Sequence, residues 1–281
     1  MIYIYLDGGF GNNLFQISRA LEIKEKYHSS VTLIAASLSS KLNTPEMMIL
    51  LCLADKYKIK IVDASPFVIR TAIARSTRRI RTSKHMNRFL PLIEFIEQVN
   101  DVKSGYWQKF DTIDVRMRLL ALDLCYLTNE YDARERRKPY AAIHIRLGDY
   151  ENHVNNQIYA SQNIFKVQEA LQNYLNSGLY DEVHIVSNDI KRAVELCEVE
   201  LSDHRIIATE NSALEDFVTL ANAKHVTTTN STFCWWAVLV SAIKGNLSGI
   251  NFSERWFNEG FEHLECPRYD LITSQILNTL K

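Results

Sequence analysis

The stretch 144–150 (His-Ile-Arg-Leu-Gly-Asp-Tyr) combines side chains that could bind and activate a charged substrate. It continues the apolar run 140–143, and a core strand that opens into polar residues at its carboxyl end is typical of the ligand crevice of an open α/β sheet. Arg146 could hold a phosphate there, because its planar fork of donors stays charged at any working pH. The alternative is a structural ion pair between Arg146 and Asp149, and this stretch alone does not decide between the two.

A glycine-rich segment, residues 7–13 (Asp-Gly-Gly-Phe-Gly-Asn-Asn), lies between the first predicted strand and the first predicted helix. Its glycines let the backbone approach a ligand closely, and the helix beyond offers N–H groups and a positive dipole end. It is no dinucleotide fingerprint, because Leu14 occupies the third glycine position, and no P-loop, because no Gly-Lys-Ser/Thr follows. The alternative is a tight turn with Asn12 or Asn13 as the helix cap.

A second strand-to-helix junction, residues 227–236 (Thr-Thr-Thr-Asn-Ser-Thr-Phe-Cys-Trp-Trp), has hydroxyls and an amide where the helix begins. Such an end either caps its own donors or turns them toward a phosphate. Trp235 and Trp236 leave a helix in different directions, so at most one would face a ligand, and a core position for both is the alternative. Ser187-Asn188-Asp189 ends a neighbouring predicted strand. Polar residues at three strand ends are expected to converge on one crevice.

Strands and helices alternate along the chain, which predicts parallel sheets with right-handed crossovers. The expected strands are 2–6, 31–35, 59–62, 140–146, 182–187, 204–208 and 225–229. The expected helices are 13–27, 45–54, 111–128, 161–176, one ending near 198, 212–222 and 231–243. A charged stretch before Pro139 is the expected linker, so the predicted fold is α/β with two domains, 1–135 and 136–281, and a cleft between them.

The chain has 281 residues, of which 47% are hydrophobic, and a formal net charge of −1. This composition predicts a sizeable core and disfavours nucleic-acid binding, because the chain has no overall positive field. No apolar run approaches the roughly 18 residues that span a bilayer, and the N-terminus lacks signal-peptide features. The five cysteines form no Cys-x-x-Cys pair and no cluster at metal spacing, so we expect free thiols and a cytoplasmic location.

A basic segment, residues 70–88, is interleaved with apolar side chains. Its basic members are Arg70, Arg75, Arg78, Arg79, Arg81, Lys84 and Arg88. One interpretation is a solvated helix face. The other is a contact with anionic lipid or with a lipid-pyrophosphate substrate, worth about 1 kcal/mol per basic residue near such a surface.

Four motifs resemble those of glycosyltransferase family 11, the α-1,2-fucosyltransferases, and occur in the family's order. Residues 8–16 (GGFGNNLFQ) are similar to its opening Gly-Gly-Leu-Gly-Asn-Gln-Met-Phe-Gln, and 144–150 to its His-x-Arg-Arg-Gly-Asp-Tyr. Residues 187–189 resemble its Ser-Asp-Asp, and 230–236 its Asn-Ser-Ser/Thr-Phe-Ser-Trp-Trp. Arg255-Trp256-Phe257 fits a tryptophan near the family's C-terminus.

The resemblance implies a GT-B fold of two Rossmann-like domains, with the acceptor on the N-terminal side and a GDP-sugar donor on the C-terminal side. It implies inverting transfer of L-fucose to the 2-hydroxyl of a galactoside, with no cofactor and no metal. The catalytic candidates that follow are Arg146, His144, Asp149 and Asn12. The donor-binding candidates are Gly9, Gly11, Arg146, Asn188, Asp189, Asn230, Ser231 and Thr232.

Two departures from the family pattern bear on the donor. Leu147 replaces the family's second arginine, and Asn188 replaces the usual first aspartate. An altered donor contact leaves room for a GDP-linked relative of fucose such as colitose. The chain also has no Asp-x-Asp motif, so Arg146 and helix N-termini would neutralise the leaving diphosphate in place of a metal ion.

The expected acceptor is a galactose-containing surface glycan such as an O-antigen of lipopolysaccharide, linked to a lipid pyrophosphate at the inner face of the cytoplasmic membrane. Alternatives are a non-catalytic GDP-sugar-binding protein and an enzyme like the protein O-fucosyltransferases with a different acceptor. An NAD-dependent dehydrogenase shares the architecture but needs a different glycine pattern. Sequence does not choose between Asp149 and His144 as the base, and a loose transition state needs little help from one.

Overall fold

The computed structural model describes residues 2–6, 8–28, 30–36, 43–64, 113–129, 138–147, 164–198, 202–252 and 256–258, with Ile272 and Ser274. The chain divides into two compact units. The first comprises Met1–Gln108 and Val115–Leu120, and the second comprises Lys109–Asp114 and Ala121–Lys281. The domain boundary expected after residue 135, linker residues 134–137 and the basic segment 70–88 all fall outside the described residues.

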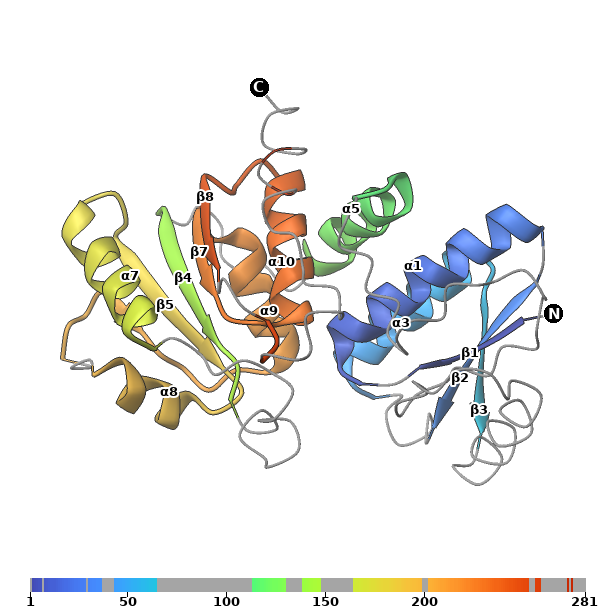
Figure 1. Ribbon diagram of the computed structural model, residues 1–281, viewed down its shortest axis with the longest axis horizontal. Helices are drawn as coiled ribbons and strands as arrows, with labels where there is room; N and C mark the ends of the chain where they lie inside the picture. Colours follow the sequence, from blue (N-terminus) through green and yellow to red (C-terminus); the bar gives the residue numbers. More distant parts are fainter. Residues whose placement is uncertain are drawn as a thin grey trace. The chain divides into compact units, whose positions relative to one another are not determined.

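The first unit contains a parallel three-stranded sheet (Figure 1). Its strands are β1 (Ile2–Leu6), β2 (Val31–Ala36) and β3 (Lys60–Ala64), in that order. The described residues of this unit include helices α1 (Phe10–Tyr27) and α3 (Pro45–Lys56). Helix α3 begins where expected, because the Thr44 hydroxyl accepts from the Met47 N–H and Pro45 occupies the first turn.

The second unit contains a parallel five-stranded sheet with helices on both faces (Figure 1). Its strands are β4 (Tyr140–Ile145), β5 (Glu182–Ser187), β6 (Ile206–Ile207), β7 (His225–Thr228) and β8 (Gly249–Phe252). Its described residues include helices α7 (Ile164–Ser177), α8 (Ile190–Cys197), α9 (Ala213–Asn222) and α10 (Thr232–Ile243). Helix α5 (Val115–Asn129) is shared between the two units.

The strand order β6-β5-β4-β7-β8 identifies the ligand edge of this sheet. The chain first moves outward from β4 to β6 and then returns past β4 to β7, so the direction of winding reverses between β4 and β7. Open α/β sheets bind ligands at such a reversal, outside the carboxyl ends of the strands. The predicted α/β class with parallel sheets in two Rossmann-like units is confirmed.

Alternation along β4 sends its side chains into two different cores. Ile143, Ile145 and Leu147 pack with residues of α7 and α8 on one face of the sheet. On the other face, the Tyr140 hydroxyl donates to the carbonyl of Thr219 in α9 at 2.7 Å. Because both faces are covered, all six residues of β4 are buried.

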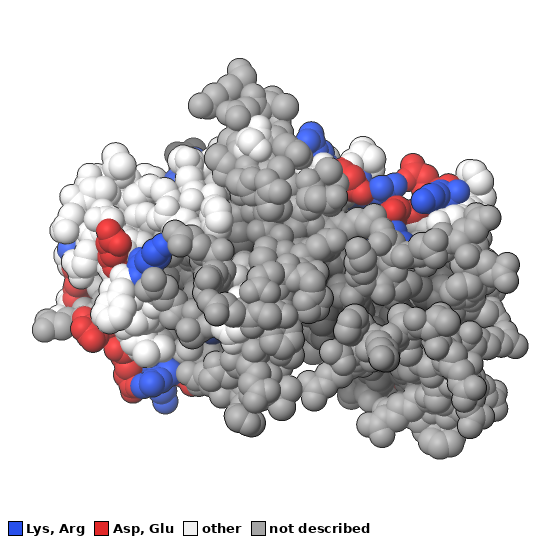
Figure 2. Space-filling model, in the orientation of Figure 1, with Lys and Arg blue, Asp and Glu red and all other residues white. Residues whose placement is uncertain are grey.

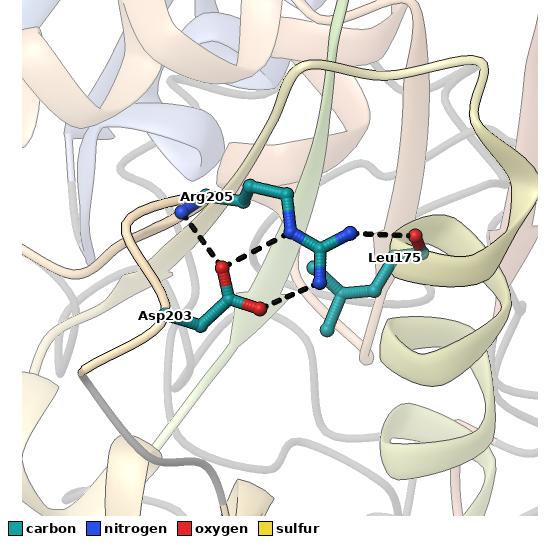
Figure 3. A network of polar contacts seen from close by, with 3 residues as sticks. All are labelled: Leu175, Asp203 and Arg205. Atoms are coloured by element: carbon teal, nitrogen blue, oxygen red, sulfur yellow. Dashed lines mark hydrogen bonds and ion pairs between the residues drawn. The ribbon is translucent and has the colours of Figure 1, made fainter.

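An arginine network ties the loop before β6 to the end of α7 (Figure 3). The Arg205 guanidinium donates to both carboxylate oxygens of Asp203, at 3.0 and 2.6 Å, and to the carbonyl of Leu175 at 2.9 Å. These hydrogen bonds lower the pKa of Asp203 to about 2. The guanidinium thus satisfies a carbonyl in the last turn of α7, where helices need outside donors.

The structure corrects two expectations about the elements. Helix α1 begins at Phe10 and not near residue 13, because Gly9 has the extended backbone of a cap and its carbonyl accepts from the Asn13 N–H. Capping by Asn12 or Asn13 is therefore wrong, and both residues lie in the first turn. Strand β8 was not expected from the sequence, although it pairs with β7 along its whole length.

The surface charge and the apolar length of the helices bear on whether the protein contacts nucleic acid or a membrane. On the face shown in Figure 2, acidic and basic side chains of the described residues are interspersed. No described helix is both long and apolar enough to cross a membrane.

Candidate functional site

Arg146 lies directly after β4, at the edge where the winding of the second sheet reverses. Its backbone N–H donates to the Thr229 hydroxyl at 3.2 Å, and the Thr229 N–H donates to the carbonyl of His144 at 3.3 Å. These contacts join the ends of β4 and β7. Since Ile145 and Leu147 occupy the core under α7 and α8, alternation directs Arg146 to the face of α9 and α10.

The N-terminus of α10 opens at the same edge, after β7. Ser231 caps the helix, and its hydroxyl accepts from the Cys234 N–H at 3.3 Å. First-turn N–H groups point out of the end of any α-helix, and the helix dipole there favours an anion. Arg146 and this helix end therefore supply two sources of positive potential at one edge of the sheet, which suits a phosphate.

The two tryptophans of α10 are core residues. Trp235 is 1% exposed and Trp236 is fully buried, and their ring centroids lie 5.3 Å apart at 80°. The alternative in which both are buried is therefore confirmed. Asn230 is also buried and donates to the carbonyl of Trp256 at 3.1 Å, which ties two of the sequence motifs together. Thr232, the first residue of α10, is partly exposed.

Asn188 and Asp189 follow β5, beside the end of β4. The Asn188 side chain accepts from the Leu147 N–H at 2.8 Å and donates to the Leu147 carbonyl at 2.9 Å. Asp189 caps α8, where its carboxylate accepts from the Arg192 N–H at 3.1 Å. Both side chains thus make structural contacts in the described chain, and their expected contact with a donor stays a prediction.

His144 is buried on the face of β4 that meets α10. Only 4% of it is exposed, and its ring stacks against Phe233 with centroids 6.0 Å apart. Burial, reinforced by the charge of Arg146, lowers the pKa of His144 to about 3. Its Nδ1 atom is buried and has no hydrogen-bond partner among the described residues. The imidazole is therefore neutral near pH 7 and a weak proton acceptor.

The glycine-rich candidates belong to the first unit. Gly9 is exposed and caps α1, Gly11 is buried in its first turn, and Asn12 is partly exposed beside it. The positive φ in this segment is that of Gly8, at 78°. A Cβ on Gly9 would meet no atom within 4 Å, so that position is open toward its surroundings. Asp149, the remaining catalytic candidate, lies outside the described residues.

Asp216 is a site candidate that sequence reading missed. It lies in the first turn of α9, next to Phe217. The ring centroids of Phe217 and Phe233 lie 5.4 Å apart. Its carboxyl accepts from the Asn211 side chain at 3.1 Å. Burial raises the pKa of Asp216 to about 7, and a carboxyl perturbed in this way beside a ligand edge is a candidate for function. No sequence motif pointed to it, because its burial is a property of the folded chain.

Asp216→Asn should change how stability depends on pH. Because the pKa of Asp216 is raised from 3.8 to about 7, the folded protein holds a proton that the unfolded chain releases between those pH values. Stability therefore falls as pH rises from about 4 to about 7, and the amide should remove that fall. The full shift corresponds to about 4 kcal/mol, which solvent screening of this partly exposed carboxyl reduces to an expected gain of about 1–2 kcal/mol at pH 8. Melting temperatures at pH 5 and pH 8 measure it, with exposed Asp181→Asn as the control. An equal effect of Asp216→Asn at both pH values would contradict the prediction.

Within the described part of the chain, no group of three or more His, Cys, Asp or Glu side chains is arranged to hold a metal ion.

One of the comparisons with known proteins identifies a family. The model of glycosyl transferase family 11 matches residues 1–263. None of the curated proteins compared with the sequence is a recognisable relative.

Solved structures give low overall similarity. POFUT1 in complex with GDP has a TM-score of 0.44 at 10% identity, covering 90% of this chain and 98% of that one. POFUT1 in complex with GDP-fucose gives the same values. KpsC of Thermosulfurimonas dismutans, a β-Kdo 2,7 transferase, has a TM-score of 0.30 at 8% identity, covering 98% of this chain and 89% of that one.

Proposed function

The chain belongs to glycosyl transferase family 11, and from that premise we propose that it moves L-fucose, or a 6-deoxy relative such as colitose, from a GDP-sugar to the 2-hydroxyl of a galactoside. The proposed transfer inverts the anomeric carbon and needs no metal. The main support for this proposal is that Arg146 and the N-terminus of α10 lie at the same edge of the sheet, where its winding reverses. That edge suits the diphosphate of a nucleotide-sugar.

The chemical step that needs help is departure of the diphosphate. Charge builds on the β-phosphate as the sugar becomes oxocarbenium-like, so a preorganised positive group there lowers the barrier. We assign this role to Arg146 and to the first turn of α10. The weakly basic, buried imidazole of His144 is better suited to lining the donor site than to removing the acceptor proton.

Leu147 does not weaken this assignment. It stands at the family's second arginine position, and its side chain is 5% exposed in the core under α7 and α8. That core lies on the opposite face of the sheet from the one toward which alternation directs Arg146. The substitution therefore leaves the proposed phosphate ligand in place.

The proposed acceptor is a galactose-containing glycan linked to a lipid pyrophosphate, reached at the cytoplasmic face of a membrane. The basic segment 70–88 supports this part of the proposal through its charge alone. Replacing Arg75, Arg78, Arg79 and Arg81 with glutamine should reduce flotation of the protein with anionic vesicles by several-fold. The same vesicles made of neutral lipid are the control. Equal flotation of both proteins would remove the basic segment from the proposal, and absence of flotation of the wild type would remove membrane contact.

Calorimetric titration of GDP in EDTA tests the donor without a choice of acceptor. We expect binding without metal, and weaker binding of ADP as the control for the base. Absence of GDP binding, or binding that appears only after a divalent ion is added, would overturn the proposed metal-independent donor site. Release of GDP from GDP-fucose on addition of a galactoside would then separate an enzyme from a non-catalytic binding protein.

A further inference from the structure

Both peptide groups that flank the Cα of Arg146 are held by side chains from neighbouring strands. The N–H on its amino side donates to the Thr229 hydroxyl, which follows β7. The N–H on its carboxyl side, that of Leu147, donates to the Asn188 amide oxygen, which follows β5. The orientation of the two flanking peptides sets the direction of the Cα–Cβ bond, so these contacts determine where the Arg146 side chain starts.

The Asn188 side chain acts as one more rung of the sheet. The ladder between β4 and β5 ends at the pair Ile145 and Ser187. Beyond it the Asn188 amide makes two hydrogen bonds to Leu147, accepting from its N–H and donating to its carbonyl. A primary amide thus takes the place of the peptide group that a longer strand would have supplied.

Thr229 has the same function on the other side of β4. It is 3% exposed, so neither its hydroxyl nor its N–H has ready access to water. It accepts from the Arg146 N–H and donates its own N–H to the His144 carbonyl, although the ladder between β4 and β7 ends at His144 and Thr228. The strand end that carries Arg146 is therefore held from both sides.

We propose that Asn188 and Thr229 are positioning residues that aim Arg146 at the donor diphosphate. The inference rests on the proposed function, because it concerns the same phosphate contact. It gives Asn188 a role that an aspartate would not fill, since an ionised carboxylate can accept from the Leu147 N–H but would face the Leu147 carbonyl with a second acceptor. A misaimed Arg146 would lose the alignment on which bidentate phosphate binding depends.

The test compares GDP affinities of variants in the wild-type and Arg146→Ala backgrounds. Asn188→Asp keeps the shape of the side chain and removes its donor. Thr229→Val removes the acceptor, and Thr229→Ser restores it. Asn222→Asp is the matched control, because it makes the same change of amide to carboxylate at the last residue of α9. The Asn222 side-chain oxygen accepts from Lys244. NMR titration extends the measurement to millimolar Kd values, and melting curves establish that each variant folds.

We expect Asn188→Asp and Thr229→Val each to weaken GDP binding by about 10-fold, the equivalent of about 1.4 kcal/mol. Thr229→Ser and Asn222→Asp should stay within about twofold of wild type. In the Arg146→Ala background, Asn188→Asp and Thr229→Val should have no further effect, because the residue through which they act is absent.

The outcomes separate this inference from the proposed function. If the wild type does not bind GDP, the proposed function fails. If Arg146→Ala binds GDP like wild type, the phosphate assignment fails and the positioning role fails with it. If Arg146→Ala alone weakens GDP binding, while Asn188→Asp and Thr229→Val bind like wild type, only the positioning inference is overturned. Equal weakening by Asn188→Asp and Thr229→Val in both backgrounds would overturn it too, because it would indicate a general structural effect. Should Asn188→Asp not fold, Thr229→Val with its serine rescue decides.

Discussion

Arg146→Ala is expected to lower turnover of the GDP-sugar by about 100-fold or more while leaving the protein folded. Loss of one preorganised donor to a developing negative charge typically has an effect of this size. The fold should tolerate the change, because Arg146 follows β4 at the sheet edge and its side chain is partly exposed, whereas its backbone makes the contact with Thr229. GDP release from the donor, followed with and without a galactoside, measures the effect.

Arg146→Lys separates the guanidinium fork from its charge. A lysine keeps the positive charge but offers a compact ammonium group, which cannot bind two phosphate oxygens in one plane. We expect it to recover at most a small part of the lost turnover. Arg192→Ala is the matched control, because the Arg192 side chain is exposed on α8 and pairs only with Glu195 among the contacts described. Near-wild-type turnover of Arg146→Ala would contradict the phosphate assignment, whichever acceptor is used.

Sequence predicted the second sheet well because its strands carry strong local signals. The apolar run of β4, the β-branched residues of β5 and β7 and the amphipathic helices between them give the expected signals. Ser231 and Asp189 cap their helices as their residue types favour. Strand β8 lacks such a signal, since Gly249 is a poor strand residue. The structure explains why a glycine occupies position 249, because a Cβ there would lie 2.5 Å from the ring of His225.

Sequence predicts which residues lie at the site, because that follows from the topology of the sheet, but it does not predict the contacts that their side chains make. Parallel strands bring their carboxyl ends to one edge, so Arg146, Asn188 and Ser231 were expected to lie near one another. What each side chain does there depends on contacts between distant segments, such as Asn188 with Leu147 and Asn230 with Trp256. The same holds for Asp216, whose raised pKa comes from burial in the folded chain. Residue type and spacing give no measure of these contacts.

Helix α10 links the stability of the second unit to its site. Its first turn forms part of the proposed phosphate site, and its body is buried, including the two tryptophans. Cys234, in the first turn directly before the tryptophans, is fully buried as well, and burial raises the pKa of its thiol to about 12. A helix packed on nearly every side holds its N-terminus rigidly, so weakening its packing should also weaken the site.

Trp236→Ala is therefore expected to lower the free energy of unfolding by about 3–5 kcal/mol, the usual range for removing a large buried aromatic side chain. The loss should be near the upper end, because Trp236 is fully buried against Trp235 and its removal would leave a cavity in the core beside α10. Urea unfolding followed by circular dichroism measures it. Phe165→Ala is the control, since Phe165 is 78% exposed on α7 and its removal should change stability by less than about 0.5 kcal/mol. If both variants unfold at the same urea concentration, α10 is not the packed support that its burial indicates, and the rigidity assigned to its phosphate-facing end loses its basis.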